Sequence, residues 1–330
     1  MNEITKTVYS MCYPESKIVL DELLSKKDEI HSMYSETFTK KQDAYHHSFL
    51  NAFKNWSKPV LDVNWSNFKF SYPTNGSSEA IREQLAHLKS VGKQNLYVFH
   101  GEYEGYEAIG KPLGFNVIKV DRESEIYSIE FKKESCFFLS QPSAIDGNVW
   151  EDYERFMCFM QQKFPFVDVY VDICYVGTIQ GKYLINLDYE NIKGVFFSLS
   201  KSFGVYYHRI GGCFLKEENP LLYGNMWFKN VFAMKYGEDL LNRIGVYYYP
   251  EAYRQKQIDA IYKLCIDRNI DITKIEISDV ILLATIDTRV ADTEALKFIK
   301  EEMNRGNKEQ VRICLTPLME ADIWKEYNEE

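Results

Sequence analysis

A chain of 330 residues can bury a full hydrophobic core and can hold two domains. Its 39 Lys and Arg residues are outnumbered by 48 Asp and Glu residues, so the net charge of -9 gives no basis for binding nucleic acid or an anionic membrane. No apolar run reaches the roughly 18 residues of a membrane span. The seven cysteines form no Cys-x-x-Cys pair and the six histidines lack metal-ligand spacing, so we expect reduced thiols in a cytoplasmic protein, without a metal site or a disulfide framework.

The order of apolar and polar segments predicts an α/β fold with three parts. Residues 1–44 are expected to form a helical segment that packs on the small domain. Over residues 45–215, strand-like runs alternate with helical stretches such as 148–162, which is typical of a mostly parallel central sheet with helices on both faces. Residues 216–330 predict a helix over 250–268, short strands and a final helix, and therefore a reduced α+β small domain.

The first candidate site lies before a predicted helix over residues 82–89. Gly76, Ser77 and Ser78 precede it, and the unpaired N–H groups of a first helical turn attract anions. The same residues also suit an ordinary helix cap with Glu79 in the first turn.

Two further strand-like runs end in polar or aromatic residues. The run 96–99 leads into a loop with Tyr103, whose ring can stack on a flat ligand. His100 competes for that position, although a histidine at the end of an apolar strand is more often packed in the core. The run 137–140 is followed by Gln141, whose amide can donate a hydrogen bond.

A β-branched and aromatic run over residues 166–171 predicts a buried strand with Asp172 and Tyr175 at its exit. Ligands of doubly wound sheets gather at such exits. The alternative is that Asp172 is a strand-end cap, and Asp168, on the same run, is expected to be structural.

The most informative segment follows the apolar run 194–197. It brings Lys201 to a turn of small hydroxyl residues that includes Ser198, and Arg209 follows eight residues after the lysine. This combination suits an enzyme in which a lysine holds an aldehyde cofactor as a Schiff base while a guanidinium and hydroxyls bind the cofactor's phosphate. Taken alone, the segment could be a surface loop.

In the C-terminal part, the tyrosine-rich stretch 246–250 could line the substrate pocket, but its β-forming aromatic residues also suit a strand without such a role. Arg312 lies in a strand-like run over 310–315 and is either a binding residue or an arginine on an edge strand. Arg289 is the reserve candidate.

These motifs resemble those of the fold-type-I pyridoxal-phosphate (PLP) enzymes, and specifically the class I/II aminotransferase family with its histidinol-phosphate aminotransferase branch. The residues Ser198, Lys201, Gly204, Arg209 and Gly211 match the pattern Ser-x-x-Lys-x-x-Gly-x-x-x-x-Arg-x-Gly of that family. The resemblance extends over roughly residues 71–213 and includes an Asp-x-x-Tyr motif at 172–175 and a Gly-Ser-x-Glu-x-Ile-like stretch at 76–81.

The chain departs from the family pattern at two positions. Gly101 replaces a proline ahead of the aromatic loop, and Gln141 replaces an asparagine. The resemblance implies a role for each matched position. The phosphate would be held by Gly76, Ser77, Ser78, Ser198 and Arg209, the ring by Tyr103, Asp172, Tyr175 and Gln141, and the substrate carboxylate by Arg312, with Lys201, Asp172 and Tyr175 as catalytic residues.

The resemblance implies an aminotransferase that moves an amino group between an amino acid and a 2-oxo acid, with Lys201 as Schiff-base lysine and general base. A lyase, decarboxylase or racemase with the same cofactor is the first alternative, and a non-catalytic protein of this fold is the second. The resemblance also implies a homodimer, with Tyr45 as a candidate to reach across the interface.

Overall fold

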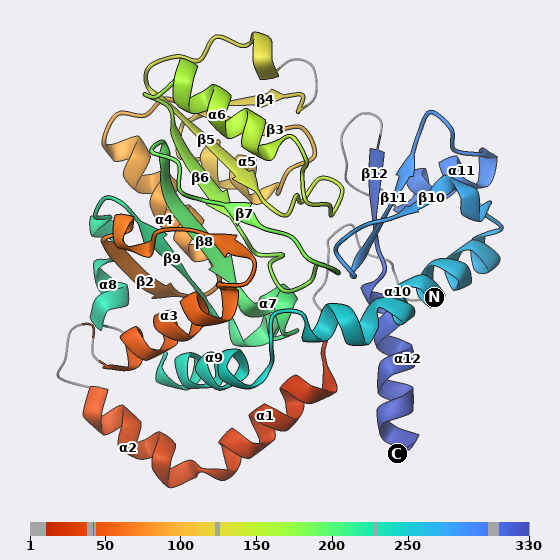
Figure 1. Cartoon of the computed structure of the whole chain (residues 1–330), viewed down its shortest axis with the longest axis horizontal. Coiled ribbons are helices and arrows are strands. Elements are labelled where there is room, and N and C mark those ends of the chain that lie inside the picture. Colours follow the sequence, from red (N-terminus) through yellow and green to blue (C-terminus); the bar gives the residue numbers. More distant parts are fainter. Residues whose placement is uncertain are drawn as a thin grey trace.

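The computed structural model describes residues 11–37, 42, 44–122, 126–227, 230–302 and 310–329. Its centre is a seven-stranded sheet with the strand order β2-β9-β8-β6-β5-β3-β4 (Figure 1). The five strands from β8 to β4 are parallel to one another, while β9 is antiparallel to both of its neighbours, which confirms the predicted mostly parallel sheet. The strands are β2 (Phe70–Thr74), β3 (Asn95–Phe99), β4 (Asn116–Val120), β5 (Ser135–Ser140), β6 (Asp168–Asp172), β8 (Ile192–Ser198) and β9 (Gly211–Leu215).

The middle strands β5, β6 and β8 are apolar on both faces because both faces are covered. On one face Phe138, Tyr170 and Phe196 stack across neighbouring strands, with ring centroids 4.7 Å apart for the first pair and 6.0 Å for the second. Phe137 and Phe197, one position along, belong to the core of the opposite face. Burial of each ring contributes roughly 1.5–3 kcal/mol. Because the sheet is covered on both sides, successive residues on either face gain from burial, and its strands read as continuous apolar runs in the sequence.

Helices cover the two faces of the sheet, as predicted (Figure 1). One core includes residues of α4 (Ser77–Ser90), α5 (Gly105–Gly110) and α8 (Tyr223–Trp227). The other includes residues of α3 (Ala44–Ser57), α6 (Tyr153–Lys163), α7 (Leu199–Ser202) and α9 (Val231–Arg243). Helix α4 begins before the predicted residue 82, and α6 begins after the predicted residue 148; ahead of it, the Val149 N–H donates to the Asp279 carboxylate at 3.0 Å.

A second, antiparallel sheet with the order β10-β11-β12 stands beside the first (Figure 1). Helix α10 connects the two sheets, and its Gln257 donates to the Val280 carbonyl at 3.1 Å. The Val280 N–H reaches the Gly147 carbonyl at 2.8 Å, and the Ile281 N–H reaches the Thr178 carbonyl at 3.0 Å. These contacts fix the second sheet against the strand exits of the first. Its elements are β10 (Ile275–Ile277), β11 (Leu283–Asp287), β12 (Gln310–Cys314), α10 (Tyr248–Arg268), α11 (Thr293–Glu302) and α12 (Thr316–Glu329).

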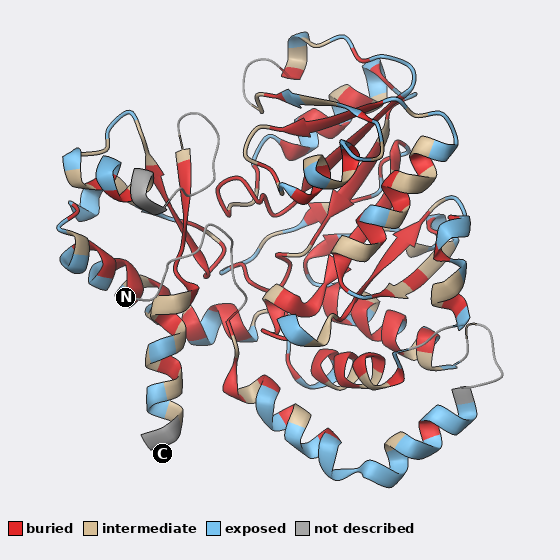
Figure 2. Cartoon of the chain, turned by 180° about the vertical axis from the view of Figure 1, so that it is seen from behind, coloured by how far each residue is buried: buried red, intermediate tan, exposed pale blue. Residues whose placement is uncertain are grey.

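The N-terminal part contains α1 (Pro14–Ser25) and α2 (Lys27–Thr37), which run along α9, and most of α2 is exposed (Figure 2). The Tyr13 ring stacks on Tyr249 with centroids 3.8 Å apart. The Ser16 hydroxyl donates to the Phe203 carbonyl at 2.7 Å. The domain boundary near residue 215 stays a prediction, and α8 and α9, which follow it, contact β2 and α3. Residues 1–10 of the predicted N-terminal segment lie outside the described residues.

The tyrosine-rich stretch at 246–249 is not a strand, because α10 begins at Tyr248. Pro250 is the third residue of this helix, where its missing N–H is not needed for an intrahelical bond. The Glu251 N–H closes the first turn on the Tyr247 carbonyl at 3.0 Å. Tyr249 is buried, so the aromatic composition reflects packing of a helix start.

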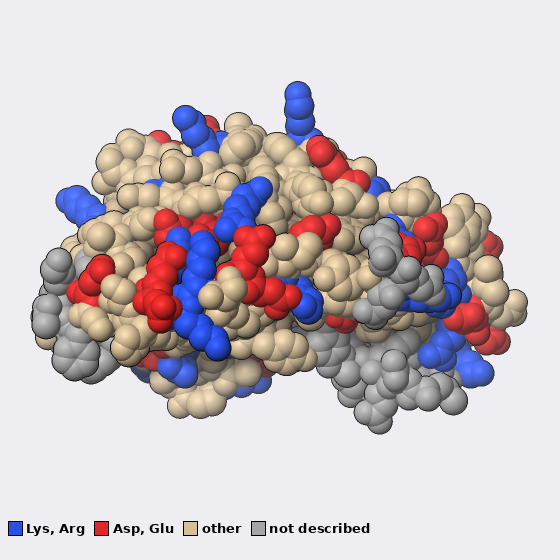
Figure 3. All heavy atoms as spheres, turned by 90° about the horizontal axis from the view of Figure 1, so that it is seen from below, with Lys and Arg blue, Asp and Glu red and all other residues tan. Residues whose placement is uncertain are grey.

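Short elements complete the described chain. In the described ranges, no helix is long and apolar enough to cross a bilayer. On the face drawn in Figure 3, acidic and basic side chains lie beside one another. The short elements are the parallel pair β1 (Leu61–Asp62) and β7 (Ile185–Asn186) and the 3-10 turns η1 (Trp65–Asn67), η2 (Ile126–Ser128), η3 (Tyr206–His208), η4 (Pro220–Leu222) and η5 (Ile272–Lys274).

Candidate active site

A cavity of about 300 Å³ lies where β5, β6 and β8 end, between the start of α4 and strand β12 of the second sheet. Residues from segments far apart in the sequence line it, as expected for the strand exits of a doubly wound sheet. Most of the residues singled out from the sequence meet here. Those that line the cavity are Ser77, Ser78, Tyr103, Asp172, Tyr175, Ser198, Lys201, Arg209 and Arg312.

One end of the cavity is built to hold an anion. Helix α4 begins at Ser77, so the unpaired N–H groups of its first turn and the positive end of its dipole lie at the cavity. Arg209 brings a guanidinium to the same place and donates to the Asn75 carbonyl at 3.0 Å. Gly76 has φ +79°, a conformation that strains any residue with a Cβ, and a Cβ there would also lie 2.9 Å from Arg209 Nη2, so glycine is favoured between the helix start and the arginine.

Lys201 reaches the cavity from the short helix α7. The Ser198 hydroxyl, at the end of β8, accepts a hydrogen bond from the Ser200 N–H at 3.2 Å and so caps this helix. Burial, with further contributions from Arg312 and Arg209, lowers the pKa of Lys201 to about 8. Roughly a tenth of the amine is therefore uncharged at pH 7, far more than for an ordinary lysine, and the uncharged amine is the form that acts as a nucleophile or a base.

Asp172 ends β6 with its side chain only 3% exposed. Burial raises the pKa of this carboxyl from 3.8 to about 7, against the effect of the hydrogen bond from the Cys174 N–H at 3.1 Å. The turn after β6 thus holds a carboxylate in a setting that favours a cationic partner. Asp168, at the other end of the strand, pairs with Lys93 at 2.6 Å, in line with the structural role expected for it.

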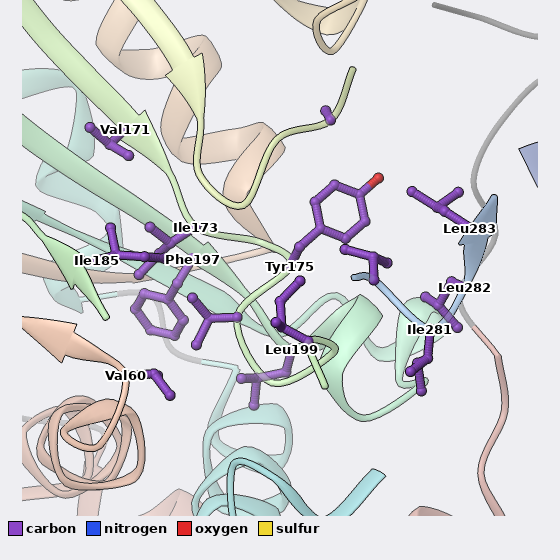
Figure 4. Packing of buried hydrophobic residues seen from close by; sticks show 14 of the residues in the cluster. Val60, Val171, Ile173, Tyr175, Ile185, Phe197, Leu199, Ile281, Leu282 and Leu283 are labelled. Carbon is purple, nitrogen blue, oxygen red and sulfur yellow. The ribbon is translucent and has the colours of Figure 1, made fainter. Parts of the chain in front are cut away.

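Two tyrosines flank the cavity. Tyr103 lies between β3 and α5, and its hydroxyl is 3.3 Å from the Ser78 hydroxyl, which ties the aromatic loop to the anion site. Burial raises the pKa of Tyr103 and of Tyr175, so both stay protonated and can donate a hydrogen bond. Figure 4 shows the Tyr175 ring between the exit of the large sheet and the segment that carries Leu282 and Leu283.

Arg312 extends into the cavity from β12 and is 6% exposed. Among the described residues its guanidinium makes no hydrogen bond and no ion pair. A buried guanidinium without a protein partner is costly unless a ligand neutralises it, so its geometry suits a carboxylate. Arg289, the reserve candidate, is exposed and forms a two-donor pair with Asp287 at 3.0 and 2.6 Å.

Some candidates lie apart from the cavity lining. Both ends of the Gln141 amide bind the main chain of Trp150, at 3.2 and 3.3 Å, because the loop after β5 folds back on the strand end. The His100 side chain does not line the cavity. Tyr45, on α3, donates to Glu36 at 2.8 Å and lines a separate hollow between α2, α3 and α9.

Several lining residues were not proposed from the sequence. Cys174 lies inside the Asp-x-x-Tyr stretch, and Ser140 is the last residue of an apolar strand, so the rule that ligands gather at strand exits could have identified both. Glu104 and Tyr206 belong to polar loops that carry no such signal. In the part of the chain that the structure describes, no group of three or more His, Cys, Asp or Glu residues could hold a metal ion.

Together these groups can perform a defined chemistry. The cavity combines a primary amine of lowered pKa, an anion site, a buried carboxyl and an arginine that has no hydrogen-bond or ion-pair partner among the described residues. Such a site can bind a phosphorylated ring compound and a second, carboxylate-bearing molecule at once. The amine then lies where it can attack a carbonyl or move a proton.

No protein-family model and no curated protein sequence matches the chain. Solved structures match it over nearly its whole length, at low sequence identity. They include a PLP-bound C-S lyase from Staphylococcus hominis (TM-score 0.69, 14% identity, 98% of this chain and 90% of that one), an amino transferase from Eubacterium rectale (0.67, 15%, 98% and 91%) and an L-threonine-O-3-phosphate decarboxylase from Porphyromonas gingivalis (0.64, 15%, 99% and 99%). The chain therefore has the fold of the fold-type-I PLP-dependent enzymes.

Proposed function

We propose that the chain is a fold-type-I PLP-dependent enzyme, and specifically an aminotransferase that acts on an amino acid and a 2-oxo acid. One observation carries this proposal: the amine of Lys201, the buried Asp172 and the anion site at the start of α4 line a single cavity. The fold supports the same conclusion, although proteins of this fold include a lyase and a decarboxylase as well as aminotransferases.

The residues of the cavity fit this cofactor group by group. The first turn of α4, with Ser77 and Ser78, and the guanidinium of Arg209 would hold the phosphate, with Ser198 beside them. Tyr103 would pack on the ring. When bound, PLP supplies an aldehyde that condenses with amines and a ring that withdraws electrons from the substrate's α-carbon.

Asp172 and Tyr175 would act on the polar atoms of the ring. The Asp172 carboxylate is desolvated and gains from a cationic partner, so it would keep a proton on the ring nitrogen. Tyr175 retains its own proton and would donate it in a hydrogen bond to the ring hydroxyl oxygen. The pair thus fixes the charge and the orientation of the ring.

Lys201 and Arg312 would act on the substrate. Arg312 offers two parallel donors to the α-carboxylate and would set which bond of the α-carbon faces the Lys201 side of the cavity. With its pKa near 8, Lys201 Nζ can accept a proton from that carbon and give it back at a different atom. An amino group changes place only if the proton moves in this way.

The test is a product analysis with the purified, PLP-loaded protein. Candidate amino acids are supplied with one 2-oxo acid, and the new amino acid and the new 2-oxo acid are both measured. Formation of the two in equal amounts supports an aminotransferase. Release of carbon dioxide, or of a thiol without transfer of nitrogen, would instead assign the site to a decarboxylase or a C-S lyase.

The proposal includes two properties that accompany this reaction in the family. We propose a homodimer, which sedimentation of the purified protein tests directly. We also propose that the protein acts in the cytoplasm, in keeping with the scattered, unpaired cysteines.

A further inference from the structure

A buried glutamate lies next to the cavity without lining it. Glu102 follows β3 and is 7% exposed. Its Oε1 accepts from the Ser140 N–H at 3.0 Å, and its Oε2 accepts from the Ser140 hydroxyl at 2.7 Å. One carboxylate therefore grips the last residue of β5 with both oxygens.

The same carboxylate also holds the aromatic loop. Glu102 Oε2 accepts from the Tyr103 N–H at 3.2 Å, and the Ser140 hydroxyl in turn accepts from the Ala144 N–H at 2.6 Å. Tyr103, Ser140 and Ala144 all line the cavity. Three lining residues from two separate strand exits thus depend on one side chain.

The charge of Glu102 fits this arrangement. Three donors converge on its two oxygens, which is the pattern of an ionised carboxylate that accepts only. Burial raises the pKa of Glu102, while the donors of Ser140 and Tyr103 and the nearby Arg122 act in the opposite direction. Arg122 is itself fixed by its ion pair with Asp146 at 2.5 Å.

We propose that Glu102 is a positioning residue that clamps the Tyr103 loop to the end of β5 and so holds the Tyr103 ring where a flat ligand packs. The loop has other anchors, namely the Tyr103 hydroxyl at 3.3 Å from the Ser78 hydroxyl and the Glu102 N–H bond to the Phe99 carbonyl at 3.3 Å, and the Glu102 carboxylate adds the bonds to the end of β5. This inference rests on the proposed function only in naming PLP as the ligand.

The test compares Glu102→Gln with Glu102→Asp. Glutamine keeps the shape but turns one acceptor into an N–H₂ group, which then faces the N–H of Tyr103 or the donors of Ser140. Aspartate keeps the charge but is one methylene too short to reach β5. Glu107→Gln is the matched control, since Glu107 lies on nearby α5, outside the cavity, and pairs with Lys111 and Lys119.

Three measurements on the full-length protein are needed. Amide hydrogen exchange, with and without PLP, should become roughly tenfold faster or more in peptides that contain Tyr103 and Ser140 in both Glu102 variants, and stay unchanged over β8. The dissociation constant of PLP should rise roughly tenfold or more, and the circular dichroism of its visible band should weaken. The control variant should match the wild type in all three readouts.

The outcomes separate the two proposals. Unchanged exchange at Tyr103 and Ser140 in folded Glu102→Gln overturns the clamp. Faster exchange spread evenly over the whole sheet also overturns it, because it indicates general destabilisation. A wild-type protein that takes up no PLP sinks the proposed function, while the exchange measurement still decides the role of Glu102. If Glu102→Gln does not fold, Ser140→Ala removes one donor and should accelerate exchange at Tyr103 and Ala144, and no acceleration there refutes the clamp.

Discussion

Asp172→Asn is expected to make the cofactor-free protein more stable while it removes most of the activity. The carboxyl is buried beside the cavity, and its pKa rises from 3.8 to about 7 because ionisation in this setting is unfavourable. Asparagine has nearly the same shape, can still accept from the Cys174 N–H and carries no charge to desolvate.

The size of the gain follows from the two pKa values. Between pH 4 and pH 7 the unfolded chain has lost the Asp172 proton while the folded chain keeps it, so the free energy of unfolding falls as pH rises. Each pH unit corresponds to about 1.4 kcal/mol, and a difference of about three units gives on the order of 4 kcal/mol. This penalty is absent below about pH 4 and complete above about pH 7, and Asp172→Asn should be free of it throughout.

Denaturant unfolding of both proteins at pH 4.5 and pH 8, after removal of PLP, measures the effect. Asp168→Asn is the matched control: it lies on the same strand but is paired with Lys93, so its loss should bring no gain at either pH. A variant no more stable than the wild type at pH 8 would refute the argument that Asp172 is desolvated. Turnover should fall at least about 100-fold, and activity within a few-fold of the wild type would remove Asp172 from the reaction.

Three further predictions address other parts of the site. Borohydride treatment of the PLP-loaded protein should label Lys201, and the rate of PLP capture should rise with pH through about 8 as the amine loses its proton; a label on another lysine would contradict this. Arg312→Ala should weaken amino-acid binding, measured from saturation curves, by about 2–5 kcal/mol, and Arg312→Lys should weaken it by less. Arg289→Ala is the control in which amino-acid binding stays unchanged. Equal binding in all variants would reject the carboxylate role of Arg312. Gly204→Ala places a Cβ 1.8 Å from a main-chain oxygen at φ +68° and should lower the free energy of unfolding by more than about 2 kcal/mol. The control Gly181→Ala, at φ +81° in open space, should lower the free energy of unfolding by only about 1 kcal/mol. Similar losses in the two variants would show that the contact at Gly204 yields easily.

The strand exits could be read from the sequence because each follows from a local pattern. Asp172 and Lys201 end or follow apolar runs, and parallel strands bring their carboxyl ends to one edge whatever the details of packing. Gln141 could not be placed in this way, because both ends of its side-chain amide are hydrogen-bonded to the main chain of Trp150. The loop that brings Trp150 there follows a path that no local pattern predicts. Glu102 was missed for the same reason, since two of its three donors come from Ser140 on another strand, which no local pattern relates to it.

The position of Arg312 is suggested by a motif, but no local pattern predicts it, because it depends on how the second sheet sits against the first. That placement comes from long-range main-chain contacts such as Val280 to Gly147. The start of α10 is another limit: the aromatic composition that favours a strand was outweighed by Pro250 and by the burial of Tyr249. Local composition predicts an element well only when packing does not compete with it.

The order in which the chain leaves the ribosome gives the N-terminal segment an unusual role. Met11, whose main chain lies against Gly204 beside the Lys201 turn, is made before the groups that hold this segment. The Ser16 hydroxyl can form its hydrogen bonds only after Phe203 and Tyr249 have been made, and the Cys12 N–H can form its hydrogen bond only after Glu320 has been made. The turn that carries Lys201 therefore gains this packing only after α12 has been made, so products that stop before α12 would leave it unfinished.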